Sequence, residues 1–235
     1  MLTLGLDTTG RCASAALAQG DRLLSECFAA AEQRHSASII PLLEQCLRQA
    51  DTARTDIDRF AVTCGPGSFT GVRIGVAAVK GMAQALRKPC AGVSTLAALA
   101  APAMALPGLL CCALDARRGQ AYAALFRAGQ RLTEDAAIPL AALEALLLSH
   151  CQPNEIIWFL GDAAPLCQAA MSCPQSRLAP PALRETRGSG AIFAASPADF
   201  GTAAALRVQY LRPSQAEREL QEKMSIINQN SESDV

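Results

Sequence analysis

Short apolar runs separated by turn signals open the chain and predict an antiparallel meander of three strands. The runs are residues 2–6, 13–18 and 23–29, and a hairpin-type Gln-Gly-Asp break separates the last two. Residues 36–50 follow with apolar positions at helical spacing. Pro41 is expected near the start of that helix, where its missing N–H group costs least.

The pattern between residues 59 and 105 predicts two strand-helix units. Residues 59–63 form a buried strand pattern, a glycine-rich turn follows, and a helical pattern then extends to Leu86. Residues 90–93 predict another buried strand, and residues 95–105 another helix. Because the meander is antiparallel and the later strands need crossover connections, the order predicts an α/β unit with a mixed sheet.

A Leu-Pro-Gly break near residue 106 predicts the start of a second unit, which gives domains at residues 1–105 and 106–212. The elements expected in the second unit are strands at 109–114, 120–127, 155–160 and 208–211 and helices at 139–149, 163–171 and 198–206. Residues 176–196 are too rich in Pro, Gly and Ser for a prediction. The tail, residues 213–235, is expected to hold a helix opened by a capping box and to end in disorder.

Composition adds expectations about the core and about partners. Apolar residues make up 51% of the chain and charged residues 18%, so both units can have a buried core. Aromatic residues are only 4%, so closely packed small side chains are expected inside. Lys plus Arg and Asp plus Glu both number 21, and this balance argues against tight nucleic-acid binding by the chain alone.

The ten cysteines have no Cys-x-x-Cys spacing and are interpreted as reduced, mostly buried thiols. His150 and Cys151, with Cys167 and Cys173 downstream, match no standard zinc pattern. The first residues run directly into a strand pattern rather than a leader, so a cytoplasmic location is expected. Prolines interrupt the uncharged stretch 96–114, so no membrane span is expected.

The turn at residues 65–75, Gly-Pro-Gly-Ser-Phe-Thr-Gly-Val-Arg-Ile-Gly, allows two interpretations. A glycine-rich turn before a helix is a generic anion site, and it is equally a tight turn that seats the helix. Its spacing fits neither the dinucleotide pattern nor the P-loop, and Pro66 excludes a nucleophile elbow. Gly71, Gly75 and Ala78 form a strip of small residues that suits a close helix contact, internal or with a partner.

Seven motifs together resemble the TsaB (YeaZ) family, bacterial subunits of the machinery that makes threonylcarbamoyladenosine in tRNA. The motifs are Leu6-Asp7-Thr8-Thr9, Arg34-His35, Leu42-Leu43, the whole turn 65–75, Gly92-Val93-Ser94-Thr95-Leu96, Asp115-Ala116-Arg117 and Tyr210-Leu211-Arg212. The match runs from residue 2 to about residue 212, and the unbroken glycine string is its specific part.

The resemblance implies an α/β fold of two ribonuclease-H-like domains of the actin-like ATPase (ASKHA) type, with mixed sheets flanked by helices. It implies a non-catalytic subunit that pairs with the metal-bearing paralogue TsaD, which transfers the threonylcarbamoyl group to the adenosine beside the anticodon. TsaE is the ATPase of the same complex, tRNA is bound only through the complex, and a homodimer is an alternative assembly. Where the paralogue has a His-x-x-x-His metal pair, this chain has Thr95 and Leu99, so no catalytic residue and no metal are expected.

Two sets of candidate residues follow from the resemblance. Candidates for nucleotide binding, with ATP or ADP at the interface of the complex, are Asp7, Thr8, Thr9, Gly65, Gly67, Ser68 and Thr70. Candidates for the partner interface are Arg34, His35, Leu42, Leu43, Cys46, Gly71, Arg73, Gly75 and Ala78.

Several alternatives stay open. A carboxylate that bonds the N–H groups of a turn has the same sequence signature as a nucleotide site at Asp7. Asp115 and Arg117 are interpreted as an ion pair across a turn, and Arg212 as a brace at the domain junction or a partner contact. A self-sufficient actin-like ATPase or phosphotransferase is the alternative function, and a metallopeptidase is a remote third.

Overall fold

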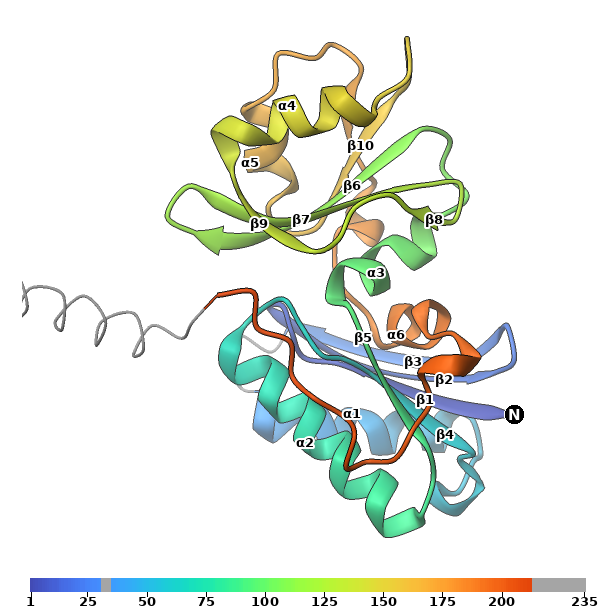
Figure 1. Ribbon diagram of the computed structural model, residues 1–235. Coiled ribbons are helices and arrows are strands. Elements are labelled where there is room, and N and C mark those ends of the chain that lie inside the picture. Colours follow the sequence, from blue (N-terminus) through green and yellow to red (C-terminus); the bar gives the residue numbers. More distant parts are fainter. Residues whose placement is uncertain (31–34, 213–235) are drawn as a thin grey trace, which may run out of the picture.

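The computed structural model describes residues 1–30 and 35–212, which form two α/β units stacked one above the other (Figure 1). Arg34, expected at the partner interface, and the expected tail 213–235 lie outside the described residues. Among the helices of the described ranges, none is long and apolar enough to cross a membrane.

The first unit is built on a five-stranded mixed sheet in the order β3-β2-β1-β4-β5. Its strands are β1 (Leu2–Asp7), β2 (Cys12–Gln19), β3 (Arg22–Ala30), β4 (Arg59–Thr63) and β5 (Cys90–Val93). The first three form the predicted antiparallel meander, and β4 and β5 run parallel to β1. Helices α1 (His35–Gln49) and α2 (Phe69–Leu86) lie side by side below this sheet, where Ile39, Leu43, Val72 and Val76 enter its core (Figure 1).

The second unit repeats the same strand order. Its sheet runs β11-β10-β6-β7-β8, and β9 (Ala136–Pro139) also pairs with β7. The other strands are β6 (Leu109–Arg117), β7 (Gln120–Arg127), β8 (Gln130–Arg131), β10 (Ile157–Leu160) and β11 (Ser176–Leu178). Helices α4 (Leu140–His150) and α5 (Ala164–Ala169) cover one face. The repeated topology confirms the predicted pair of ribonuclease-H-like sheets with flanking helices.

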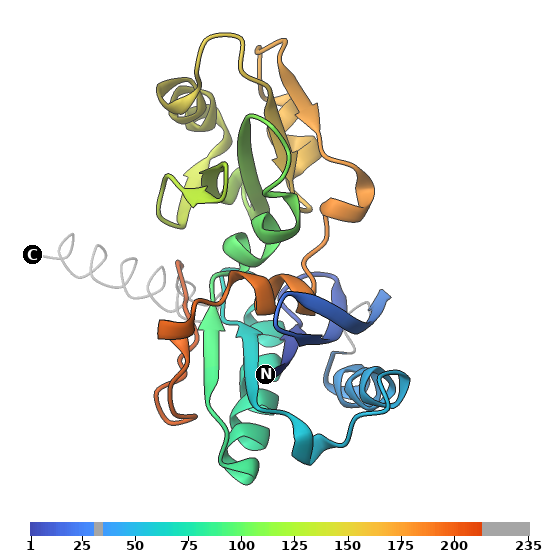
Figure 2. The same ribbon diagram turned by 90° about the vertical axis from the view of Figure 1, so that its right-hand side faces the viewer.

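The two units exchange their last helices, which lie between the sheets (Figure 2). Helix α3 (Thr95–Ala100) follows β5 but packs on β6 and β7, where Leu96 and Leu99 join the core of the second sheet. Helix α6 (Gly188–Ala194) follows β11 but packs on β1, β2 and β4. The domain boundary expected at residues 105–106 stays a prediction, because a helix on each side of it packs on the other unit.

Glycine makes the contact between α6 and the first sheet possible. A Cβ atom placed on Gly188 would lie 2.6 Å from the carbonyl oxygen of Gly5, and one placed on Gly5 would lie 2.2 Å from the carbonyl oxygen of Gly188. Real Cβ atoms do not approach so closely, so a side chain at either position would push α6 off the sheet.

Four local expectations were wrong. Residues 198–206 hold only a short 3₁₀ turn (Pro197–Asp199), and residues 208–211 form no strand. Gly201 exchanges two backbone hydrogen bonds with Cys90, at 2.9 and 3.0 Å, which ties this segment to the start of β5 against its alanine-rich helical propensity. Pro41 lies inside α1 rather than near its start, and α3 ends at Ala100, where a 3₁₀ turn (Ala101–Ala103) replaces it.

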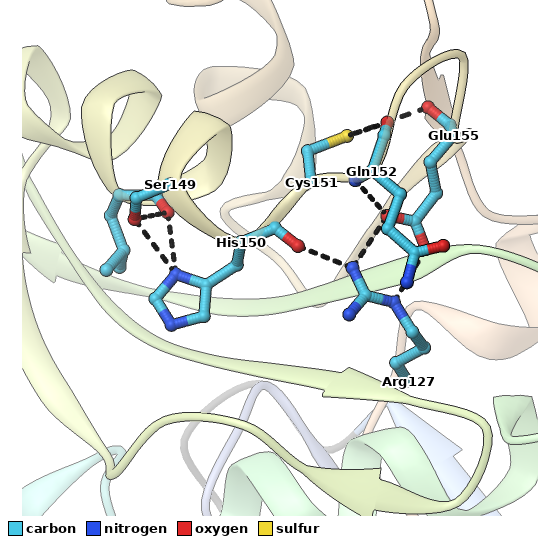
Figure 3. A network of polar contacts seen from close by, with 7 residues as sticks. Arg127, Ser149, His150, Cys151, Gln152 and Glu155 are labelled. Atoms are coloured by element: carbon cyan, nitrogen blue, oxygen red, sulfur yellow. Dashed lines mark hydrogen bonds and ion pairs between the residues drawn. The ribbon is translucent and has the colours of Figure 1, made fainter.

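A polar network joins β7 to the last turn of α4 and to the loop that follows it (Figure 3). Arg127 donates from Nε to Glu155 Oε1 at 2.7 Å, from Nη2 to Glu155 Oε2 at 2.6 Å, and to the carbonyl oxygen of His150 at 2.5 Å. Burial opposes ionisation of Glu155, but the bonds from Arg127 and from the Gln152 N–H outweigh it and lower the pKa of the carboxyl.

Glu155→Gln is expected to lower the free energy of unfolding by about 2 kcal/mol near neutral pH, because a charge-assisted pair is lost. A carboxyl whose pKa is lower in the folded state stabilises the fold above its unfolded pKa and loses that contribution as the pH falls through its folded pKa. Urea unfolding of both proteins at several pH values should therefore show the difference shrinking in acid. A difference that is constant down to about pH 3 would contradict this account.

Candidate functional site

Asp7 ends β1 at the junction of the two units, and its side chain is fully buried. Oδ1 accepts hydrogen bonds from Thr9 Oγ1 at 2.7 Å and from Thr63 Oγ1 at 2.5 Å, and the Thr9 N–H lies 3.4 Å from the same oxygen. Oδ2 accepts from Thr186 Oγ1 at 2.6 Å. The carboxylate is thus satisfied by donors of this chain, which supports its interpretation as the brace of a turn.

The glycine turn packs directly on the Asp7 turn. A Cβ atom on Gly71 would lie 2.0 Å from the carbonyl oxygen of Thr8, while Thr8 Oγ1 donates to the Gly71 carbonyl at 2.7 Å. The Ser68 N–H donates to the Thr9 carbonyl at 2.8 Å, and Ser68 Oγ caps α2 by accepting from the Gly71 N–H at 3.2 Å. These bonds favour the second interpretation of the turn, in which it seats the helix.

Four of the residues expected at the partner interface do not lie at the surface of this chain. Gly71 and Gly75 face the Asp7 turn, and a Cβ atom on Gly75 would lie 2.6 Å from Thr8 Oγ1. Leu43 and Cys46 are buried in the core of the first unit. The two glycines allow close approach to the Asp7 turn, and Leu43 and Cys46 pack in the core, so none of the four residues is exposed.

The other expected interface residues lie nearer the surface, with one exception. His35 is buried and its Nε2 lies 3.0 Å from the carbonyl oxygen of Gly10. Leu42 and Ala78 are partly buried against the core, and Arg73 is exposed. Only part of the expected set is therefore accessible to a partner.

A cleft of about 1140 Å³ lies between the two units. The glycine turn forms one wall, and the hairpin of β6 and β7 forms the other. Thr9, Gly67, Ser68 and Thr70 line the cleft, whereas Asp7, Thr8 and Gly65 are not among its lining residues. Four of the seven candidate nucleotide residues therefore line the cleft, and the other three do not.

Polar residues of the second unit complete the cleft. Asp115 forms an ion pair with Arg117 at 3.3 Å, as expected, and Asp162 Oδ1 accepts from the Asp115 N–H at 2.9 Å. Arg212 Nη1 donates to the carbonyl oxygen of Ala116 at 2.8 Å, so this residue braces the domain junction.

Two of the groups that bind the Asp7 carboxylate could not be found from the sequence. Thr186 lies in the segment for which no element was predicted, and Thr63 is distant from Asp7 in sequence. The stacked rings of Phe69 and Tyr210, whose centroids are 4.7 Å apart, also join segments far apart in the chain.

Thiol and metal chemistry have little support in the described part of the chain, where no group of three His, Cys, Asp or Glu residues could hold a metal ion. Burial raises the pKa of the Cys64 thiol to about 11 and that of Cys167 to about 12. Thiols of this kind are not nucleophiles at neutral pH.

Asp7→Ala is expected to lower the free energy of unfolding by about 3 kcal/mol, since it leaves three threonine hydroxyl groups without their acceptor in the interior. Asp21→Ala, at an exposed hairpin turn, is the control and should change stability little. Chemical denaturation measures both. An Asp7→Ala protein as stable as the control would show that the carboxylate does not brace the junction.

The chain matches known proteins in sequence. The family model described as TsaD, tRNA N6-adenosine threonylcarbamoyltransferase, matches residues 29–159. The tRNA threonylcarbamoyladenosine biosynthesis protein TsaB of Bacillus subtilis is 37% identical over 134 residues, 57% of this chain and 58% of the relative. TsaB of Escherichia coli is 37% identical over 124 residues, 52% of this chain and 53% of the relative. The matches therefore span about half the length of these curated relatives.

The structural likeness extends further along the chain. YeaZ from Pseudomonas aeruginosa superimposes with a TM-score of 0.76 and 25% identity, covering 89% of this chain and 99% of that one. Both units described above therefore have counterparts in a single solved protein. The family model covers more than half of the chain, and the chain thus belongs to the TsaD family of tRNA N6-adenosine threonylcarbamoyltransferases, where it resembles the members named TsaB (YeaZ).

Proposed function

We propose that this protein acts in the formation of threonylcarbamoyladenosine in tRNA, as a non-catalytic subunit that pairs with and activates the TsaD transferase. The observation that carries the proposal is the combination of TsaB relatives, a family model of the transferase and a YeaZ-like fold over both units. TsaE joins the same complex in this proposal.

The non-catalytic role rests on the chemistry at the head of α3. The resemblance places the two metal-binding histidines of the paralogue at the positions that Thr95 and Leu99 occupy in this chain. Both residues are fully buried, and Leu99 packs with Leu110 and Cys112 in the core of the second unit. A hydroxyl and an alkyl group in that position offer no metal site comparable to two imidazoles.

The outward ridge of α1 and α2 is the surface that we assign to the partner. It consists of small and apolar residues that lie on the exposed or half-buried side of the two helices: Ala37, Ile40, Pro41, Ile74, Ala77 and Gly81. Nothing lies within 4 Å of a Cβ atom placed on Gly81, so this part of α2 is open to close approach by another helix.

A shared ancestry makes the equivalent helices of TsaD the proposed occupant of this ridge. Two related chains can form a pseudo-symmetric pair through the same face, as a homodimer does with two identical chains. A second copy of this chain is therefore the competing occupant, and it would have to leave before TsaD binds.

ATP or ADP is assigned to the interface of the assembled complex rather than to this chain alone. Three threonine hydroxyl groups of this chain already donate to the fully buried Asp7 carboxylate, which leaves it poorly placed to hold hydrated Mg²⁺. The cleft still offers space, so an ATPase of its own is the alternative. Robust ATP turnover by the purified chain, lost in Asp7→Asn, would favour that alternative.

Ala77→Arg is expected to abolish pairing with TsaD, because a long charged side chain on the ridge prevents close packing of helices. Ala145→Arg is the matched control, since Ala145 is an exposed alanine on α4 in the other unit. Size-exclusion chromatography with light scattering on each variant mixed with TsaD measures the pairing. Melting temperatures should match the parent within a few degrees, because both sites are exposed.

Normal pairing by Ala77→Arg would refute the assignment of the ridge. Failure of the unmodified chain to pair with TsaD, with and without ATP, would refute the scaffold function itself.

A further inference from the structure

Positive charge is concentrated on one side of an otherwise neutral chain. The stretch 69–88, which includes α2, contains four basic residues and no acidic residue. The stretch 200–212 contains two basic residues and no acidic residue. Because basic and acidic residues number 21 each in the whole chain, these two stretches depart strongly from its average.

The two stretches lie against each other. Arg73 Nε donates to the hydroxyl group of Tyr210 at 2.6 Å near the start of α2. Along the last turns of α2 and just past its end, a groove of about 620 Å³ is lined by residues between 80 and 89 on one side and by residues 201–204 on the other. Figure 1 shows the red end of the chain crossing α2 accordingly. We call this surface the α2 flank, with the cations Arg73, Lys80, Arg87, Lys88, Arg207 and Arg212.

The charges of the α2 flank are available to a ligand. Arg73, Arg87 and Arg207 are exposed, and the other three cations are half-buried. Within residues 1–30 and 35–212, none of the six forms an ion pair with a carboxylate, whereas Arg127 and Arg187 pair with Glu155 and Glu26. The carbonyl and hydroxyl partners of Arg73, Arg207 and Arg212 leave their positive charge uncompensated.

Aromatic rings stand at one end of the flank, beside the cleft. Phe69 and Tyr210 are stacked, Tyr210 is 43% exposed, and the guanidinium group of Arg73 lies 3.9 Å from the centre of the Phe69 ring. Exposed aromatic rings next to arginine are the groups on which unpaired nucleic-acid bases stack. An acidic protein segment would use the cations but would not need this platform.

Arg87 occupies a backbone position that glycine normally takes. It ends α2 with φ of 53° and ψ of 41°, and its N–H donates to the carbonyl oxygens of Ala83 and Gln84. A non-glycine residue costs about 1 kcal/mol in this left-handed cap. The Arg87 side chain is exposed, so its charge belongs to the flank while its backbone forms the cap.

We propose that the α2 flank binds the phosphate backbone of tRNA, with Phe69 and Tyr210 receiving an unpaired base. The choice of tRNA as the polyanion rests on the proposed function. Arg73 and Arg87 are separated by about 21 Å along the helix, a length suited to several successive phosphates rather than to one bound nucleotide. None of the six cations of the flank belongs to the residues of the ridge of α1 and α2.

The test is the affinity of fluorescently labelled tRNA for the full chain, alone and mixed with TsaD, measured by anisotropy over a series of salt concentrations. Lys80→Glu with Arg87→Glu reverses two charges of the flank. Arg22→Glu with Arg177→Glu makes the same change of net charge at exposed residues of β3 and β11. The flank variant is expected to bind about tenfold more weakly or worse, with a smaller salt dependence, and the control should retain the parent affinity.

Equal losses in the two double variants, or no loss in either, would overturn the proposal. Pairing with TsaD, followed by size-exclusion chromatography, should be the same in both. If tRNA binding depends on the flank but the chain does not pair with TsaD, the scaffold function fails and the RNA proposal stands. If the chain pairs normally with TsaD but the flank variant binds tRNA as tightly as the parent, only the RNA proposal is overturned.

Arg87→Gly separates a binding role from a structural one. Glycine suits the left-handed cap, so the melting temperature should stay equal or rise, while tRNA affinity should fall about threefold or more because one phosphate contact is lost. A variant that is more stable and binds tRNA as well as the parent would remove Arg87 from the binding surface and contradict the proposal.

Discussion

A carboxylate buried without a cation has to be satisfied by hydrogen-bond donors, and Asp7 takes them from three separate parts of the chain. Thr9 is local, Thr63 belongs to β4, and Thr186 comes from the segment that leads into α6. Because the cost of an unsatisfied buried charge is several kcal/mol, these segments cannot separate without losing a large part of the stability of the fold. Through Thr186 the Asp7 carboxylate ties the segment that leads into α6 to the end of β1, and through Thr63 it ties β1 to the end of β4.

The exchange of α3 and α6 extends that constraint to the whole molecule. Each helix lies in the sequence of one unit and packs on the sheet of the other, so one face of each sheet is covered by residues from the other half of the chain. The Arg212 bond to Ala116 adds a further tie across the junction. Moving the two units apart would therefore expose apolar side chains of α3 and α6 to water.

Much of the fold could be predicted from the sequence because it depends on local pattern. The meander, β4, α2 and the hairpin of β6 and β7 follow from periodicity and turn residues that lie close together in the chain. The stretch 198–211 could not be predicted, since bonds from Gly201 to Cys90 and from Gln209 to Cys64 override its own propensities.

The candidate site was predictable in its location but not in its detail. The glycine turn and the Asp-Thr-Thr turn were singled out, and they do meet at the cleft. Small residues at Gly71 and Gly75 indicated a close approach, but nothing in the sequence distinguished a partner helix from the carbonyl of Thr8. Two of the three threonines that bond Asp7 lie 56 and 179 residues away, a distance over which a single sequence gives no pairing information.

The concentration of cations on the α2 flank has a consequence that appears before any contact is made. In a chain with equal numbers of basic and acidic residues, an excess of one sign on one side requires an excess of the other elsewhere. The protein therefore carries an electric dipole moment while its net charge is zero. Near a polyanion, such a dipole experiences a torque that turns the flank toward the negative charge. Encounters then occur preferentially in the productive orientation, although the neutral molecule as a whole is only weakly attracted from a distance.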